Sequence, residues 1–325
     1  MDFRLADSPA QSRSTRVAAG LFNPVVFRKV TEGWRAAASL QEAKACYAGA
    51  QTMLNESFYH PIGMWRIHGS EAEKQSWESK MCPAGVGAFL GPSVPPDQTA
   101  MLYAPFGVSE VPEAGFIETE RFLDALQGYL KSSGRLIQGQ TPTQHWERSE
   151  NGWEWASMCF EKVVFAEGYL LQQRNDLPSN LLNPAKGEIL IIEAPELPQK
   201  IINGKVYMVP LGSGRFRVGS TYAWRQTDDQ PSLEKRAELI LALQSMIKCP
   251  FAIIHQDAGI RPTVPDRRPI LGEIPHKPGQ YLFNGMGTKG VLLAPLLARE
   301  FFDFLLQNKP LPDDVRIERF YETAN

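Results

Sequence analysis

The chain has 325 residues, of which 43% are apolar and 22% charged, with a formal net charge of −2; this composition suits a globular protein of one large domain or two. The near-neutral balance leaves no basic surface for nucleic acid or for an anionic membrane, so we predict neither as a partner. The four cysteines are scattered, which argues against a disulfide framework. The N-terminus has no apolar leader and the chain has no long apolar run, so we predict neither a secretory signal nor a membrane span. Together these features favour the cytoplasm.

The first elements follow from alternation and helix propensity. Apolar and polar residues alternate over 2–7, which predicts a short strand. The alanine-rich stretch 33–57 predicts a long helix. Ser70 and Glu73 form a capping-box pattern, which predicts a helix from about Glu71 to Lys80.

The middle of the chain alternates between helices and strands. We expect strands over 59–68 and 101–108, and an amphipathic helix over 118–134 that ends at Gly134. The pair Asn203-Gly204 is a strong hairpin signal. Further strands are expected over 135–140, 162–168, 188–194, 201–210, 215–224 and 280–283, and helices over 232–247 and from about 290 to 308.

This order of elements predicts a mixed α/β protein in two parts. Residues 1–56, 113–184 and 249–325 form the part in which helices and strands alternate. Residues 57–112 and 185–248 form a second, strand-rich part.

The stretch 259–272 combines three prolines with three arginines. Because proline fixes φ and lacks an N–H, this segment suits neither a helix interior nor a central strand. A stiff loop lowers the ordering cost of presenting a guanidinium group to a ligand. A structural ion pair is the alternative. Arg267 and Arg268 flank Asp266 at what we interpret as a solvated turn.

The stretch 284–290, NGMGTKG, lies between a predicted strand and the last predicted helix. The first amides of a helix have no internal partners and favour an anionic group. Lys289 adds a cation at the same place. The pattern favours an electron-rich ligand, and a tight turn for which glycines suffice is the alternative.

Seven stretches carry a family resemblance, and they cover residues 12–24, 115–134, 163–170, 183–190, 206–224, 258–272 and 284–295. In this order they resemble the glycine oxidase and D-amino-acid oxidase family of FAD-dependent oxidoreductases. The resemblance implies a Rossmann-like FAD-binding domain and an antiparallel β-sheet domain for the substrate. It also implies that FAD is bound non-covalently and takes a hydride at N5 from the carbon that bears the amine nitrogen of an amino acid or amine.

One part of the family pattern is missing. The family opens with a strand and a G-x-G-x-x-G turn, whereas this sequence opens at what resembles the second strand, with Asp7 where the ribose-binding acid falls. The FAD-binding domain is therefore expected to be incomplete, through truncation or as a natural flavin-free relative. We expect the chain as given to bind FAD poorly and to be weakly active or inactive.

The resemblance also implies site residues. Arg261 holds the substrate carboxylate, the Tyr207 hydroxyl reaches the substrate, and Tyr222 and Trp224 wall the pocket, with core packing as the alternative for the three aromatic residues. Thr288 stands where glycine-oxidase-like relatives carry an arginine. The residues implied to contact the cofactor are Asp7, Ser14, Arg16, Ala19, Gly20, Leu21, Gly168, Gly285, Gly287, Thr288, Lys289, Gly290 and Val291.

Two rival functions stay open. One is oxidation of an amine carried on a larger molecule such as modified tRNA, which requires a basic funnel that the net charge argues against. The other is a flavin-free binding or scaffold module. The five histidines show no ligand spacing, so we predict no metal site.

Overall fold

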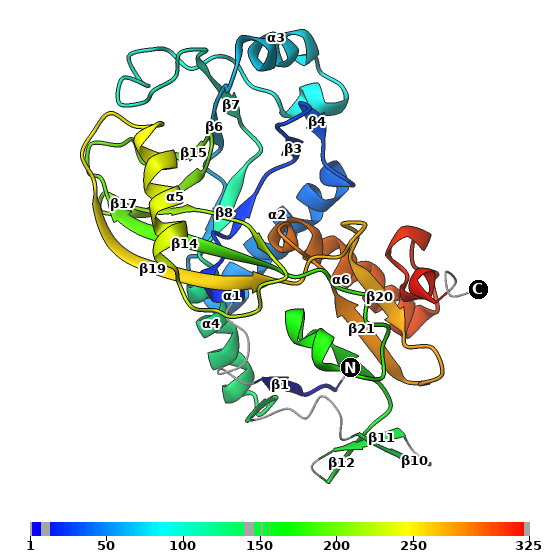
Figure 1. Ribbon diagram of the computed structural model, residues 1–325. Helices are drawn as coiled ribbons and strands as arrows, with labels where there is room; N and C mark the ends of the chain where they lie inside the picture. Colours follow the sequence, from blue (N-terminus) through cyan, green and yellow to red (C-terminus); the bar gives the residue numbers. More distant parts are fainter. Residues whose placement is uncertain (1, 8–13, 140–145, 151, 156, 322–325) are drawn as a thin grey trace.

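The computed structural model describes residues 2–7, 14–139, 146–150, 152–155 and 157–321. Its largest feature is an eight-stranded mixed sheet in the order β18-β14-β17-β16-β15-β6-β7, with β19 paired to the other side of β14 (Figure 1). These strands are β6 (Met64–Ile67), β7 (Val108–Val111), β14 (Ala185–Glu193), β15 (Ile201–Asn203), β16 (Tyr207–Gly212), β17 (Arg215–Gly219), β18 (Ala223–Trp224) and β19 (Ala252–Arg261).

The two faces of this sheet have different roles. Helix α5 (Leu233–Gln244) covers one face, where Leu243 and Phe216 are fully buried in an apolar core. Because side chains alternate along a strand, the neighbours of Phe216 in the sequence point to the opposite face. That face carries Arg217 and, further along the sheet, Arg261.

Parallel strands and long helices form the rest of the molecule. Strand β13 (Val163–Phe165) pairs in parallel with β21 (Gln280–Asn284), and β1 (Leu5–Asp7) pairs in parallel with β9 (Leu136–Gln138). Helix α6 (Gly290–Gln307) packs along α2 (Ala36–Leu54), as Figure 1 shows. The remaining elements are α1 (Ser14–Val17), β2 (Leu21–Phe22), β3 (Val25–Val26), β4 (Thr31–Glu32), β5 (Tyr59–His60), α3 (Glu71–Lys80), β8 (Gly115–Ile117), α4 (Thr119–Ser132), β10 (Glu147–Ser149), β11 (Gly152–Trp155), β12 (Met158–Phe160) and β20 (Ile270–Glu273).

These elements confirm the mixed α/β class and several local predictions. Helix α3 begins where the capping pattern places it, with Ser70 Oγ accepting a hydrogen bond from the Glu73 amide. Strands β15 and β16 form the predicted antiparallel hairpin around Gly204. Gly134 ends α4 with a φ of 67°, in the left-handed region that favours glycine.

Two strand predictions were wrong in detail. The strand expected over 101–108 lies at Val108–Val111 instead, because Pro105 cannot donate to a sheet and Gly107 turns the chain at a φ of 88°. The strand expected over 59–68 is divided into β5 and β6 by Pro61 and by Gly63, whose φ is 70°.

The large sheet continues past the domain boundary expected at residue 248. Strand β19 pairs with β14 from Ala252 to Arg261. It is an edge strand, and Pro262 follows its last residue, as the proline-rich sequence requires. The division into two domains stays a prediction. None of the helices in the described residues is both long and apolar enough to cross a membrane.

Candidate active site

A cavity of about 510 Å³ lies between the free face of the large sheet, the loop after α1 and the start of α6; we call it the inner cavity. Residues predicted from sequence line it from all three sides. They are Ser14, Ala19, Gly20, Leu21, Tyr207, Tyr222, Arg261, Gly287, Thr288, Gly290 and Val291.

Arg261 enters the inner cavity from the last position of β19. An ideal Cβ on Gly187 would lie 1.9 Å from Arg261 Nη2, so glycine at this position of the paired strand leaves room for the guanidinium where it now lies. The guanidinium donates to Ser220 Oγ at 2.5 Å and to the Thr221 carbonyl at 3.2 and 3.3 Å. Within the described residues it forms no ion pair with an acid, so the alternative of a structural ion pair is not observed there.

Two tyrosines flank this guanidinium. The ring of Tyr222 lies over Arg261, with 4.4 Å between the ring centroid and Cζ, a favourable cation–π geometry. Tyr207 lies on β16 opposite Gly219. Burial raises the pKa of the Tyr207 phenol, and the positive charges of Arg261 and Arg217 oppose this rise. Its hydroxyl is therefore neutral at ordinary pH and can donate a hydrogen bond.

The start of α6 presents unsatisfied amides. The amides of Thr288, Gly290 and Val291 have no hydrogen-bond acceptor in the described part of the chain, although the amides of Leu292 and Leu293 both donate to the Lys289 carbonyl. All three residues with free amides line the inner cavity. Free amides at a helix start are donors for an anionic or electron-rich group.

Lys289 does not line the inner cavity. Its ammonium lies near Gly33, where an ideal Cβ would approach Nζ to 2.9 Å. Burial lowers the pKa of Lys289, and the positive charge of Arg268 lowers it further. The Lys289 ammonium therefore lies near Gly33 and is not part of the inner cavity lining.

Five other predicted residues lie outside the cavity lining. Asp7 accepts a hydrogen bond from Gln127 at 2.7 Å, and Arg16 pairs with Asp124 at 2.7 Å. Trp224 stacks with Tyr222, with 6.2 Å between the ring centroids. Gly168 and Gly285 lie near the ends of β13 and β21.

The turn that carries Arg267 and Arg268 is less solvated than expected. Arg268 lies over the Trp34 ring at 4.9 Å and beside Asp314 at 3.6 Å. Asp266 accepts a hydrogen bond from Arg319 at 2.9 Å. Only Arg267 is exposed without such a contact within the described residues.

Tyr47 and Ser220 are two side chains of the site that the sequence did not predict. Tyr47 lines the cavity from α2, and its hydroxyl donates to the Val291 carbonyl at 2.9 Å, which ties α2 to the start of α6. Ser220 supports Arg261. Tyr47 stands within an alanine-rich helix and had the pattern of a core residue, so no sequence signal marked it.

The charge of the inner cavity is simple. Arg261 carries its one formal charge, since no aspartate, glutamate, histidine or lysine of the described residues lines it. The remaining lining is apolar, hydroxylic or backbone. The cavity therefore favours an anion and disfavours a second cation.

This architecture is that of flavin-dependent oxidoreductases. The crystal structure of glycine oxidase from Geobacillus kaustophilus superposes with a TM-score of 0.77 at 21% identity, covering 95% of this chain and 89% of that one. The FAD dependent oxidoreductase family, abbreviated DAO, matches residues 6–303. The chain belongs to this family, and its cofactor is FAD.

Two sequence relatives differ in what their names say they do. Glycine oxidase of Bacillus subtilis (strain 168) is 28% identical over 233 residues, which is 65% of this chain and 61% of that protein. The tRNA 5-methylaminomethyl-2-thiouridine biosynthesis bifunctional protein MnmC of Nitrosospira multiformis is 27% identical over 212 residues, 58% of this chain. The match spans only 34% of the MnmC protein.

Proposed function

We propose that this protein oxidises the C–N bond of an amino acid, or of another small amine that carries a carboxylate. FAD, when bound, supplies the two-electron acceptor that takes a hydride at N5 from the carbon bearing the nitrogen. The imine so formed is then hydrolysed by water. The observation that carries this proposal is the meeting of Arg261 and the free α6 amides in one cavity.

The residues of the inner cavity fit a non-covalently held flavin. Three free amides, of Thr288, Gly290 and Val291, offer donors for the carbonyl edge of the ring, where reduction leaves negative charge. Gly20 permits the close backbone on the opposite side, because a Cβ there would lie 1.8 Å from the Ile117 carbonyl oxygen. We propose that these segments hold the flavin ring.

Arg261 would hold the carboxylate. It lines the cavity without an acid partner in the described residues, and Tyr222 and Ser220 fix the plane of its guanidinium. A prepositioned guanidinium binds a carboxylate at low ordering cost. The neutral Tyr207 hydroxyl would donate to the same ligand.

The substrate amine would react in its uncharged form. An ammonium placed beside Arg261 meets no acid among the described residues of the cavity lining. The like charge of Arg261 therefore favours loss of the ammonium proton to water before reaction. The role of the protein is positioning, with Arg261 on the carboxylate and Tyr222 against the side chain.

The decisive experiment is anaerobic mixing of the full chain, with FAD added in excess, with glycine, N-methylglycine or methylamine. We expect the visible flavin absorbance to bleach with an amine that carries a carboxylate and not with methylamine. Arg261→Met should weaken substrate binding about 100-fold, the loss of a charge-assisted hydrogen-bond pair, and leave FAD affinity unchanged. Arg267→Met, an exposed arginine of the same loop, is the matched control.

The two ways of failing have different meanings. If FAD binds and none of the amines bleaches it, the amine-oxidising proposal is wrong. If no FAD binds even in excess, the alternative gains support, namely a flavin-free binding or scaffold module.

An amine carried on tRNA is a second candidate, and one observation favours it. Tyr222 and Trp224 are half-exposed, stacked on each other, and next to the cavity. Exposed aromatic rings of this kind can stack on a base. Competition by total tRNA against FAD reduction would support this candidate, and an unchanged rate at low salt would exclude it.

A further inference from the structure

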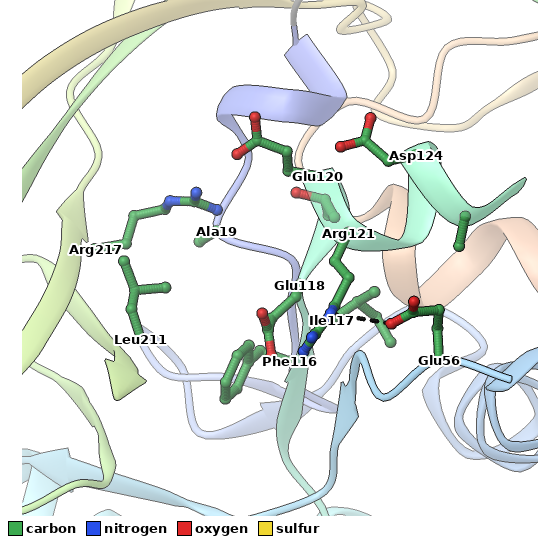
Figure 2. A pocket seen from close by; sticks show the side chains of 12 residues that line it. Ala19, Glu56, Phe116, Ile117, Glu118, Glu120, Arg121, Asp124, Leu211 and Arg217 are labelled. Carbon is green, nitrogen blue, oxygen red and sulfur yellow. Dashed lines mark ion pairs between the residues drawn. The ribbon is translucent and has the colours of Figure 1, made fainter. Parts of the chain in front are cut away.

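A second cavity of about 650 Å³ adjoins the inner cavity; we call it the outer cavity (Figure 2). Ala19, Ile117 and Thr119 line both cavities, so they form the wall between them. The proposed oxidation assigns no role to the outer cavity.

Arg217 is the cation of its sheet wall. It lies on β17 between Ile191 of β14 and Val209 of β16, and its side chain points into the cavity toward Ala19 in Figure 2. Nη1 donates to the Ala18 carbonyl at 2.6 Å, and this is the one hydrogen bond that its guanidinium forms within the described residues. The buried Nε has no partner there. Burial lowers the pKa of Arg217, a sign of incomplete solvation.

Carboxylates stand on the opposite wall, at the start of α4. Glu120 and Glu118 act electrostatically on Arg217 from this wall, and Asp257 acts on it from β19, yet none of the three forms an ion pair with it. Glu118 is in contact with His60 at 2.6 Å. Among the described residues Glu120 forms an ion pair with Arg16 alone, at 3.9 Å, and its side chain is 65% exposed. Figure 2 shows open space between Arg217 and these two glutamates.

We propose that the outer cavity binds a zwitterionic α-amino acid, with its carboxylate on Arg217 and its ammonium on Glu120. The other charged residues of the lining are paired, Arg121 with Glu56 at 3.2 Å and Asp124 with Arg16 at 2.7 Å. A simple anion would be repelled by the two glutamates, and a simple cation by Arg217, so a ligand that carries both charges fits best. This site is distinct from the inner cavity, whose lining has a cation and no acid in the described residues.

The two sites share a contact. Arg217 and Thr119 both donate to the Ala18 carbonyl, at 2.6 and 3.3 Å. Ala18 itself lines the inner cavity. A ligand on Arg217 therefore lies one hydrogen bond away from the backbone that borders the inner cavity.

Glycine is the probe, and calorimetric titration of the full chain is the measurement. The Arg261→Met background removes the inner cation, so that remaining glycine binding reports the outer cavity alone. We expect glycine binding to persist in this background and to weaken at least 10-fold when Arg217→Met is added. Acetate and methylammonium should each bind at least 10-fold more weakly than glycine. Arg215→Met, an exposed arginine of the same strand, should change nothing.

A second variant protects the test against misfolding. Glu120→Gln alters an exposed side chain and should weaken glycine binding while leaving acetate binding equal or stronger. The proposal is overturned if glycine binding disappears with Arg261→Met alone, if Glu120→Gln leaves glycine affinity unchanged, or if acetate binds as tightly as glycine. None of these readouts needs flavin reduction, so they stand apart from the test of amine oxidation.

Discussion

Two arginines on one face of the large sheet stand in opposite electrostatic settings. Arg261, on edge strand β19, meets no acid in the described lining of the inner cavity. Arg217, on central strand β17, faces Glu118 and Glu120 across the outer cavity. Two arginines on one sheet can therefore select different forms of an amino acid. Arg261 favours a carboxylate with an uncharged amine, and Arg217 favours a carboxylate with a charged ammonium. The opposite wall determines which.

The largest expected effect comes from closing the space beneath Arg261. Gly187→Ala places a methyl group 1.9 Å from the present position of Nη2, so the guanidinium must move. We expect substrate affinity to fall about 100-fold, or roughly 2.7 kcal/mol, while glycine binding in the outer cavity is kept. Gly49→Ala, a helix position with nothing within 4 Å of the added methyl, is the control. Equal losses of ligand affinity in the two cavities would mean that they are not independent sites.

Glu167 is a buried carboxyl group whose ionisation lowers the stability of the fold. Burial raises the pKa of Glu167 to about 7 from its usual 4.5, and its Oε2 has no hydrogen-bond partner in the described part of the chain. A folded-state pKa above the unfolded one means that the contribution of Glu167 to stability is most favourable below pH 4.5 and falls as the pH rises to about 7.

Glu167→Gln removes this penalty. We expect the variant to be more stable than the native chain by roughly 2 kcal/mol above neutral pH, and equal to it below the ordinary carboxyl pKa, in urea unfolding. Glu154→Gln, on an exposed strand position, should show no such difference. A constant gap at all pH values would mean that Glu167 is not neutralised by burial.

The smallest expected effect is a pH slope. Because no acid of the described residues lines the inner cavity, the substrate must lose its ammonium proton before it reacts. The value of kcat/KM should rise about tenfold per pH unit until it reaches the pKa of the substrate amine, and then level off. Steady-state rates with N-methylglycine give this profile. A flat profile would indicate an unrecognised base near the substrate amine. The inner cavity would then hold a group that accepts a proton, as the glutamates of the outer cavity can.

Local sequence signals predicted the start of α6, the hairpin at Gly204 and the cap of α3, because each depends on neighbouring residues. The family resemblance, which rests on seven stretches in the family order, also assigned Arg261 and the start of α6 to one site. The role of Arg217 could not be predicted from the sequence, because it depends on the register of β14, β16 and β17 and on where α4 begins.

Lys289 shows why direction is harder to predict than position. At the start of a helix, successive side chains point about 100° apart, so neighbouring residues cannot all face one cavity. Thr288 and Val291 line the inner cavity, and Lys289 between them points toward Gly33. Sequence places all three in one loop and cannot tell which way each one points.

A crystal structure of the FAD-loaded protein soaked with methoxyacetate, the oxygen analogue of N-methylglycine, would show where the acid binds. We expect the carboxylate within hydrogen-bond distance of the Arg261 guanidinium, with the flavin ring against the amides of Thr288, Gly290 and Val291. A carboxylate bound elsewhere, with the Arg261 guanidinium still donating only to protein oxygens, namely those of Ala185, Ser220 and Thr221, would contradict this expectation.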